Sequence, residues 1–149
     1  VNSHFGNDAV LRVAIDQSRL RHLGKFQLGM VNSFLLTSPI RDSFFSDAED
    51  LHANQAETDL MLHLAPETVD MDAVEDDPDR TDGTVLSHPV SQTSLNGVTG
   101  RPSEGTADRG AELFAEMVQA LTDRAQSALT EEPPLPPEHW SGVSPVPAH

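Results

Sequence analysis

A nearly continuous apolar segment, residues 26–36 (FQLGMVNSFLL), limits the possible folds most strongly. Such a run is typical of a strand in a parallel sheet that is covered on both faces. It follows an expected helix over residues 8–23, which has Asn7 or Asp8 as its N-cap, Gly24 as its C-cap and one apolar face (Ala9, Val10, Val13, Ala14 and Leu20). Because the first residues resemble the end of another strand, the sequence predicts a right-handed βαβ unit.

The rest of the chain is expected to be helical or irregular. Residues 37–51 are predicted to be a loop, followed by a helix over about 55–65 that stops near Pro66. A strong helix is expected over 107–129, with one apolar stripe (Ala111, Phe114, Val118, Leu121 and Ala125).

Two segments are poor in periodicity. Residues 70–105 are rich in Asp, Gly, Pro and Thr and are predicted to be a long functional or contact loop, with one short strand around residues 84–86. Residues 131–149 are proline-rich and are predicted to be an extended tail, so that the domain occupies residues 1–130.

These elements predict an α/β fold, a three-layer α/β/α sandwich with a mainly parallel sheet. A two-stranded parallel sheet cannot bury both of its faces alone. We therefore expect this chain to hold only the C-terminal half of such a domain.

Charge and cysteine content exclude several classes of function. The chain has 24 acidic and 9 basic residues, a net charge of −15, so we expect no nucleic-acid partner and no anionic membrane partner. The absence of cysteine excludes disulfides, thiolate zinc sites and cysteine nucleophiles. No apolar run is long enough for a membrane span, and a cytoplasmic location is expected.

Two clusters could carry chemistry. His4 lies at the expected carboxyl end of a strand, where α/β folds place their active sites. The segment DLHANQAETD, residues 50–59, offers His52 and, at the start of a helix, Glu57. Histidine and carboxylate ligands suit zinc, manganese or iron, and such a metal activates water for hydrolysis.

Each of these residues also has a structural interpretation. His4 could be a structural histidine, and Glu57 could simply interact with the helix dipole. His63 is expected to be a satisfied helix histidine, and the other histidines are expected in loops or at the terminus (His22, His88, His139 and His149). The segment EDDPD, 75–79, lacks EF-hand spacing and is predicted to be a solvated loop.

Three ordered blocks resemble the creatininase (creatinine amidohydrolase) family. The family has a strand ending in Asn-Gly-His-Gly-Gly-Asn, and residues 2–7 here are NSHFGN. Its Asp-x-His-Ala-Gly-x-x-Glu-Thr-Ser block is similar to residues 50–59, followed in both by Leu-Met-Leu and a Pro-Glu-x-Val stretch, here residues 66–69. Its Gly-Val-x-Gly-x-Pro stretch is similar to residues 97–102. The resemblance covers roughly residues 1–129.

The resemblance implies a dinuclear-metal amidohydrolase, commonly assembled as a hexamer. By this analogy His4 is a metal ligand, Glu57 is a ligand or a site carboxylate, and His52 binds substrate or moves a proton to the leaving nitrogen. Phe5 and Asn7 are expected to contact substrate beside His52. The cofactor would be a pair of divalent ions, zinc, manganese or iron.

The departures from the family pattern are also informative. Ser3 and Phe5 replace two glycines, and Gly6 stands where true creatininases have a Glu. Ala48 stands where they use a Trp, so creatinine is not the expected substrate. The family's remaining ligands, a Glu-x-His pair and an Asp, precede the Asn-Gly-His strand and are not in this sequence.

The sequence therefore predicts a metal-dependent amidohydrolase that hydrolyses a C–N bond in a small amide, lactam or formamide. An N-terminal half, on a longer polypeptide or a separate subunit, would supply the missing ligands, in a homo- or hetero-oligomer. The alternative is a non-catalytic assembly subunit that keeps the fold but has lost the metal chemistry.

Overall fold

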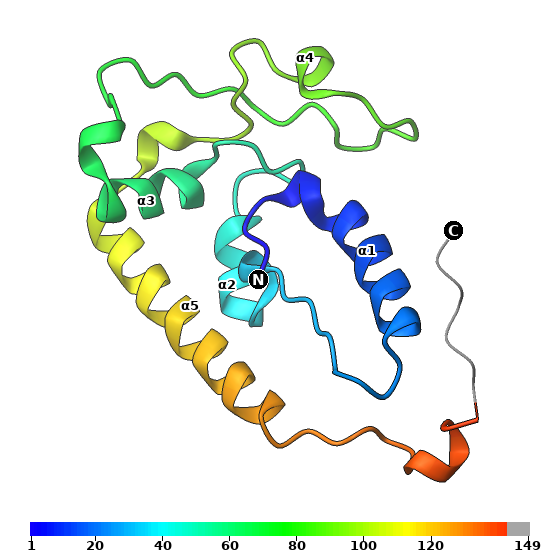
Figure 1. Ribbon diagram of the computed structural model, residues 1–149. Coiled ribbons are helices and arrows are strands. Elements are labelled where there is room, and N and C mark those ends of the chain that lie inside the picture. The colour runs from blue at the N-terminus through cyan, green and yellow to red at the C-terminus, as the bar shows by residue number, and fades with distance from the viewer. Residues whose placement is uncertain (143–149) are drawn as a thin grey trace. The chain divides into compact units, whose positions relative to one another are not determined.

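The computed structural model describes residues 1–142 (Figure 1). These residues form two compact units. Of the described residues, the terminal unit comprises 1–33 and 122–142, and the central unit comprises 34–121. The helices are α1 (Asp8–Arg21), α2 (Ser38–Phe44), α3 (Gln55–Leu64), α4 (Val90–Thr93) and α5 (Ala107–Ala128). Short 3₁₀ turns occur at Phe5–Asn7, Ser33–Leu35, Pro66–Thr68, Pro102–Glu104 and Pro137–His139.

Three helices confirm the sequence predictions. α1, α3 and α5 lie within one or two residues of the ranges expected from periodicity. α3 begins at Gln55 and is capped by Asn54, whose side chain accepts the N–H of Glu57 at 3.2 Å. It ends one residue before Ala65, because a residue that precedes proline is driven out of the helical region.

The loop predicted over 37–51 is wrong in part, because it contains α2. The Thr37 hydroxyl caps this helix by accepting the N–H of Ile40 at 3.3 Å, and Pro39 occupies its first turn. Ile40 and Phe44, four residues apart, are both buried on one face of the helix. The sequence Thr-Ser-Pro at residues 37–39 is a typical helix start and could have predicted the N-terminus of α2.

The buried strand predicted over 26–36 is also wrong. Asn32 forms a single parallel bridge with Asn2, and the next residues turn into a 3₁₀ helix. Phe26 and Leu28 keep 48% and 39% of their surface exposed. A parallel strand needs neighbours on its edges and cover on both faces, and only Asn2 pairs with this segment in the described part of the chain. The parallel sense of that bridge is the one a βαβ unit requires.

The short strand predicted around residues 84–86 does not form either. Val85 and Leu86 are 96% and 71% exposed, and they lie just beyond a turn at Gly83, whose φ is 72°. The long segment is fastened instead by two isolated antiparallel bridges, His52–Thr99 and Asp77–Gly100. Within residues 1–142, β-structure is limited to isolated bridges, so the predicted sandwich and its sheet are not confirmed.

The core of the central unit is small and joins α2, α3 and α5. Its buried side chains are Phe34, Ile40, Phe44, Leu51, Ala56 and Leu113. α5 packs with Gly110 and Leu113 buried, and Met117 and Ala120 partly buried. The buried stripe of α5 therefore lies one position before the predicted one, and the predicted Phe114 and Val118 are 37% and 47% exposed.

The terminal unit has little apolar cover. The predicted apolar face of α1 is exposed, with Val10 at 71%, Val13 at 59% and Leu20 at 50%. The predicted C-cap is wrong as well, since α1 ends at Arg21 and Gly24 shapes the turn that follows, with φ of 74°.

The proline-rich segment contacts this turn within the terminal unit. The Trp140 indole N–H donates to the Leu135 carbonyl at 2.9 Å, and the Trp140 ring lies against Gly24. Residues 143–149 lie outside the described part, and the boundary expected at residue 130 stays a prediction. None of the helices in residues 1–142 has both the length and the apolar character needed to cross a bilayer.

Gly110 sets the distance between α3 and α5, which gives a first prediction. A Cβ at this position would overlap the Asp59 carbonyl. We expect Gly110→Ala to lower the free energy of unfolding by about 1–3 kcal/mol through overpacking, despite alanine's better helix propensity. Urea unfolding followed by circular dichroism measures this. Gly29→Ala is the control, since a Cβ there meets no atom within 4 Å; equal stability of the two variants would contradict the close approach.

Candidate functional site

Asn2 holds the backbone of His4 from both sides. Its Oδ1 accepts the His4 N–H at 3.2 Å, and its Nδ2 donates to the His4 carbonyl at 2.9 Å. Asn2 is itself buried and bridged to the neighbouring segment through the Val31 carbonyl and the Ser33 N–H, each at 2.8 Å. The Asn of the Asn-x-His motif is therefore a positioning residue, a role that we had not assigned from the sequence.

A polar chain continues from Asn2 to the start of α1. Asn2 Nδ2 donates to Asn32 Oδ1 at 2.9 Å, and Asn32 Nδ2 donates to Asp8 Oδ1 at 2.5 Å. Arg12 Nε donates to the other Asp8 oxygen at 2.7 Å. Hydrogen bonds from Arg12 and Asn32 lower the pKa of Asp8. These bonds tie the His4 turn to the first turn of its helix.

The His4 ring lies over Gly6 and is exposed. A Cβ at Gly6 would come within 3.1 Å of His4 Nε2. The ring makes no hydrogen bond within residues 1–142. Phe5 is 44% exposed, and Asn7 donates its backbone N–H to the His4 carbonyl at 3.1 Å. Phe5 and Asn7 thus share the turn of His4, and their substrate contacts stay predictions.

The second motif meets the third one in space. The Thr99 N–H donates to the His52 carbonyl at 2.8 Å, and the Thr99 hydroxyl donates to the Asp50 carbonyl. Thr99 is fully buried. The His52 ring nitrogen Nδ1 bonds the Gly97 carbonyl, and the ring is exposed. Residues 97–100 therefore fix both the backbone and the ring of His52, although their role could not be read from the sequence.

Glu57 has a structural partner next to His52. Ala53 takes a left-handed conformation, φ of 51°, and donates its N–H to Glu57 Oε2 at 2.6 Å. The carboxylate thus holds a backbone conformation that a residue with a side chain rarely adopts. This contact fits the structural interpretation of Glu57 and leaves its other oxygen, Oε1, for a ligand role, which stays a prediction.

Asn54 is the fully buried anchor of the same turn. Its Nδ2 donates to the Phe44 carbonyl at 2.7 Å and to Asp47 Oδ1 at 2.8 Å. Asp47 Oδ2 accepts the N–H groups of Gln55 and Arg101 at 3.1 and 2.6 Å. Asn54, at a position where the family commonly has Gly, thus links the His52 block to α2.

The other histidines have ordinary contacts. His63 packs its ring 5.8 Å from that of Phe114, and His22 packs 4.7 Å from Phe26. His88 Nδ1 lies 3.2 Å from Gln92 Oε1. His149 lies outside the described residues.

The donor set of this chain only partly fits a dinuclear metal site. His4 and Glu57 offer the nitrogen and oxygen donors that zinc, manganese and iron accept. However, residues 1–142 contain no group of three or more His, Cys, Asp or Glu side chains placed to hold a metal ion. These residues alone do not fit the pair of ions expected.

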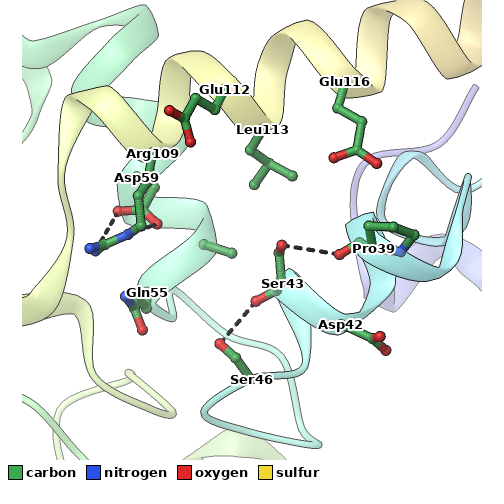
Figure 2. A pocket seen from close by; sticks show the side chains of 11 residues that line it. Pro39, Asp42, Ser43, Ser46, Gln55, Asp59, Arg109, Glu112, Leu113 and Glu116 are labelled. Atoms are coloured by element: carbon green, nitrogen blue, oxygen red, sulfur yellow. Dashed lines mark hydrogen bonds and ion pairs between the residues drawn. The ribbon is translucent and has the colours of Figure 1, made fainter.

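A separate shallow cleft of about 550 Å³ opens between α2, α3 and α5 (Figure 2). Arg109 makes two 3.1 Å bonds to Asp59 on its wall, and Asp59 also accepts the Thr106 N–H at 2.5 Å. None of the predicted site residues lines this cleft. The other lining residues are mostly polar or acidic (Pro39, Asp42, Ser43, Ser46, Gln55, Ala56, Glu112, Leu113 and Glu116).

Hydrogen bonds thus hold the backbone turns of both histidine motifs in place. Comparison with known proteins identifies the family. The sequence model of the creatininase family, described as creatinine amidohydrolase, matches residues 1–125. This chain belongs to the creatininase family. The resemblance of the three sequence blocks is thereby confirmed, and the members of this family are hydrolases.

Curated relatives in this family are peptidases. The mycofactocin precursor peptide peptidase of Mycobacterium ulcerans is 32% identical over 130 residues, and that of Mycolicibacterium smegmatis is 29% identical over 128 residues. Each alignment covers 83% of this chain and 46% of the relative. The chain therefore spans about half the length of the curated relatives it matches.

Solved structures show the same fold. A Bacteroides fragilis protein named for creatinine amidohydrolase superposes with a TM-score of 0.71 at 22% identity, over 87% of this chain and 52% of that protein. A mutant creatininase complexed with creatine gives 0.62 at 20% identity, over 81% and 51%. A Zn-Zn type mutant creatininase gives the same score over 81% and 50%. The creatininase fold is α/β, which supports the predicted class at that level.

The prediction of a solvated loop over the acidic segment 75–79 is wrong in part. Asp77 is 3% exposed, and Asp79 accepts the N–H groups of Glu49 and Asp50 at 2.8 and 3.0 Å. Hydrogen bonds from Arg80 and the Leu95 N–H hold the pKa of Asp77 far below its ordinary value. Burial raises the pKa of Asp79, but its bonds from Thr81, Asp50 and Glu49 outweigh this and lower it.

These lowered values predict acid sensitivity. A carboxyl whose folded pKa is depressed stabilises the fold above its unfolded pKa of about 4, and this contribution is lost as pH falls through the folded value. We expect urea midpoints to be flat from about pH 7 to 5 and to fall below that. Asp77→Asn should lower the neutral midpoint and flatten the acid limb, whereas exposed Asp82→Asn should leave both unchanged. An unaltered acid limb in Asp77→Asn would contradict the assignment.

Proposed function

We propose that this chain is the C-terminal half of a metal-dependent amidohydrolase, one that hydrolyses an amide C–N bond. The observation that carries the proposal is the creatininase-family match over residues 1–125, which includes both histidine motifs. A divalent metal bound in such a site supplies a Lewis acid and an activated water. Zinc is the metal named for one similar structure, and manganese or iron would suit the same donors.

The chain's own residues would divide the work. His4, held by Asn2 and carrying a ring without a protein partner in residues 1–142, would bind metal. His52, with its ring exposed, would contact substrate and move a proton to the leaving nitrogen. Glu57 would contribute as a ligand or site carboxylate through its second oxygen.

The substrate is proposed from chemistry and from the relatives. A small amide, lactam or formamide fits the expectation from the sequence, and Ala48 in place of a tryptophan argues against creatinine. The curated relatives, which are more similar in sequence than the solved creatininases, are named as peptidases of a precursor peptide. A peptide amide is therefore the second substrate class to test, and its hydrolysis breaks the same kind of bond.

The remaining half of the family domain is the proposed partner, on the same polypeptide or on another. The relatives are about twice as long as this chain, and the apolar face of α1 with Val10, Val13 and Leu20 is exposed. Phe26 and Leu28 are exposed as well. Covering such surface is worth about 25 cal/mol per Å². We propose that strands of the other half cover it and supply the missing ligands, in a cytoplasmic oligomer, a hexamer by analogy.

The competing function is a non-catalytic assembly subunit. It is favoured by the lack of any three-residue metal group within residues 1–142 and by the structural contact that occupies Glu57. In this case the bulky Phe5 beside His4 would belong to a site that has lost its chemistry.

Histidine substitutions in the complete assembly separate the two functions. We expect His4→Ala to lose bound metal and activity together. His52→Ala should keep its metal but lose about 10²–10⁴-fold in hydrolysis rate, the usual contribution of a proton-transfer group. Native mass spectrometry with metal analysis measures the first effect, and hydrolysis of cyclic amides, formamides and short peptides measures the second.

His88→Ala is the matched control, because the exposed His88 ring, which precedes α4, bonds only the Gln92 side chain within the described residues. It should retain metal and rate. If His4→Ala keeps both metal and activity, the proposed ligand role fails. If the unaltered assembly binds no metal and hydrolyses none of these amides, the assembly subunit is the better account.

A further inference from the structure

The turn from Ser94 to Gly97 presents one carbonyl to the ring of His52. The Gly97 carbonyl bonds His52 Nδ1, and Gly97 adopts a φ of 87°, which a residue with a side chain rarely does. A carbonyl oxygen can only accept a hydrogen bond. When the ring is neutral, Nδ1 must therefore carry the proton in this contact, and Nε2 must carry the lone pair.

The turn is held from behind by Ser94. Its Oγ accepts the Gly97 N–H at 2.9 Å and lies 2.7 Å from the Val98 carbonyl and 2.9 Å from Asp77 Oδ2. The hydroxyl thus contacts the residue that presents the carbonyl, the residue after it, and a buried carboxylate. A change at Ser94 would move the Gly97 peptide directly.

Asp77 is the fixed end of this chain. Its side chain is buried, and it accepts Arg80 at 2.6 Å and the Leu95 N–H at 2.6 Å as well as facing Ser94. Its backbone also exchanges two bonds with Gly100, at 2.6 and 3.2 Å. Hydrogen bonds to a charged group are shorter and stronger than neutral ones, so this carboxylate fixes the turn that carries Gly97.

We propose that Asp77 and Ser94 are positioning residues which, through the Gly97 carbonyl, hold His52 in the Nδ1–H tautomer with Nε2 as its basic nitrogen. This proposal rests on the proposed function only for what the tautomer would be used for, since a proton acceptor or a metal ligand needs a basic Nε2. The tautomer itself is a property of this chain's own contacts. A free histidine side chain in water favours the opposite tautomer, so the selection is measurable.

The neighbouring Asp76 supplies a matched control. Its carboxylate accepts the Ser103 N–H at 2.9 Å and the Ser103 hydroxyl at 2.7 Å, the same kind of cap in the same segment. Within the described residues, the side chains of this pair make no hydrogen bond to Ser94, Gly97 or His52. Asp76→Asn and Ser103→Ala therefore remove a side-chain cap in the same segment without removing a hydrogen bond on the path to His52.

The experiment is ¹⁵N NMR of the His52 ring in the complete protein at about pH 9, where histidine is neutral. Protonated and unprotonated ring nitrogens resonate at well-separated shifts, and His52→Gln identifies the signal. We expect the unaltered protein to hold the Nδ1–H form as its main species. Asp77→Asn and Ser94→Ala should shift at least about half of the population to the Nε2–H form, while Asp76→Asn and Ser103→Ala leave it unchanged.

The possible outcomes are distinct. A main Nε2–H species in the unaltered protein overturns the proposal, and so does an unchanged tautomer in Ser94→Ala. If Asp77→Asn fails to fold, Ser94→Ala and the tautomer of the unaltered protein still decide it. Because the readout needs no substrate, failure of the hydrolase function and failure of this positioning role are distinguishable.

Discussion

The central unit depends on aspartate carboxylates that bind backbone N–H groups. A chain segment without a β-ladder must still satisfy its buried amides. Here Asp47 accepts two of them, Asp59 accepts the first amide before α5, and Asp79 accepts those of Glu49 and Asp50. Asp77 does the same for Leu95. Part of the chain's large negative charge is therefore internal structure, not only a solvated surface.

These carboxylates also explain how separated motifs come together. The second and third family blocks are about forty residues apart, yet Thr99 and Gly97 hold the backbone and the ring of His52. Asp47 joins them from a third direction, by bonding Asn54 and the Arg101 N–H. Residues 97–100, which belong to the third family block, thus support the backbone and the ring of His52, the residue proposed to move a proton.

Sequence reasoning succeeded where the information was local and failed where it depended on distant chain. The helix over 107–128 follows from periodicity, and α3 follows from its segment and the stop near Pro66. The apolar run 26–36 has the hydrophobicity of a buried strand, but a strand also needs neighbours, and Asn2 alone pairs with it in the described residues. His4 and His52 were found by their motif spacing. The spacing did not identify Asn2, Asp77 and Gly97, because each acts through a contact with another residue that no local sequence pattern reveals.

The two predicted ligands are not equally free to change partners. The His4 ring nitrogens have no protein partner in residues 1–142, and Gly6 leaves room beside Nε2 where true creatininases have a Glu. Glu57 already holds the N–H of Ala53 in its left-handed conformation, so releasing Oε2 would expose that strain. If Glu57 serves through Oε1 alone, its contact with Ala53 is kept, and only the use of Oε2 as well would carry that cost. Under the proposed function, His4 can bind metal through its ring without giving up a hydrogen bond within residues 1–142, whereas Glu57 must keep Oε2 on Ala53 and can offer Oε1 alone. The other half of the domain would then supply the remaining donors.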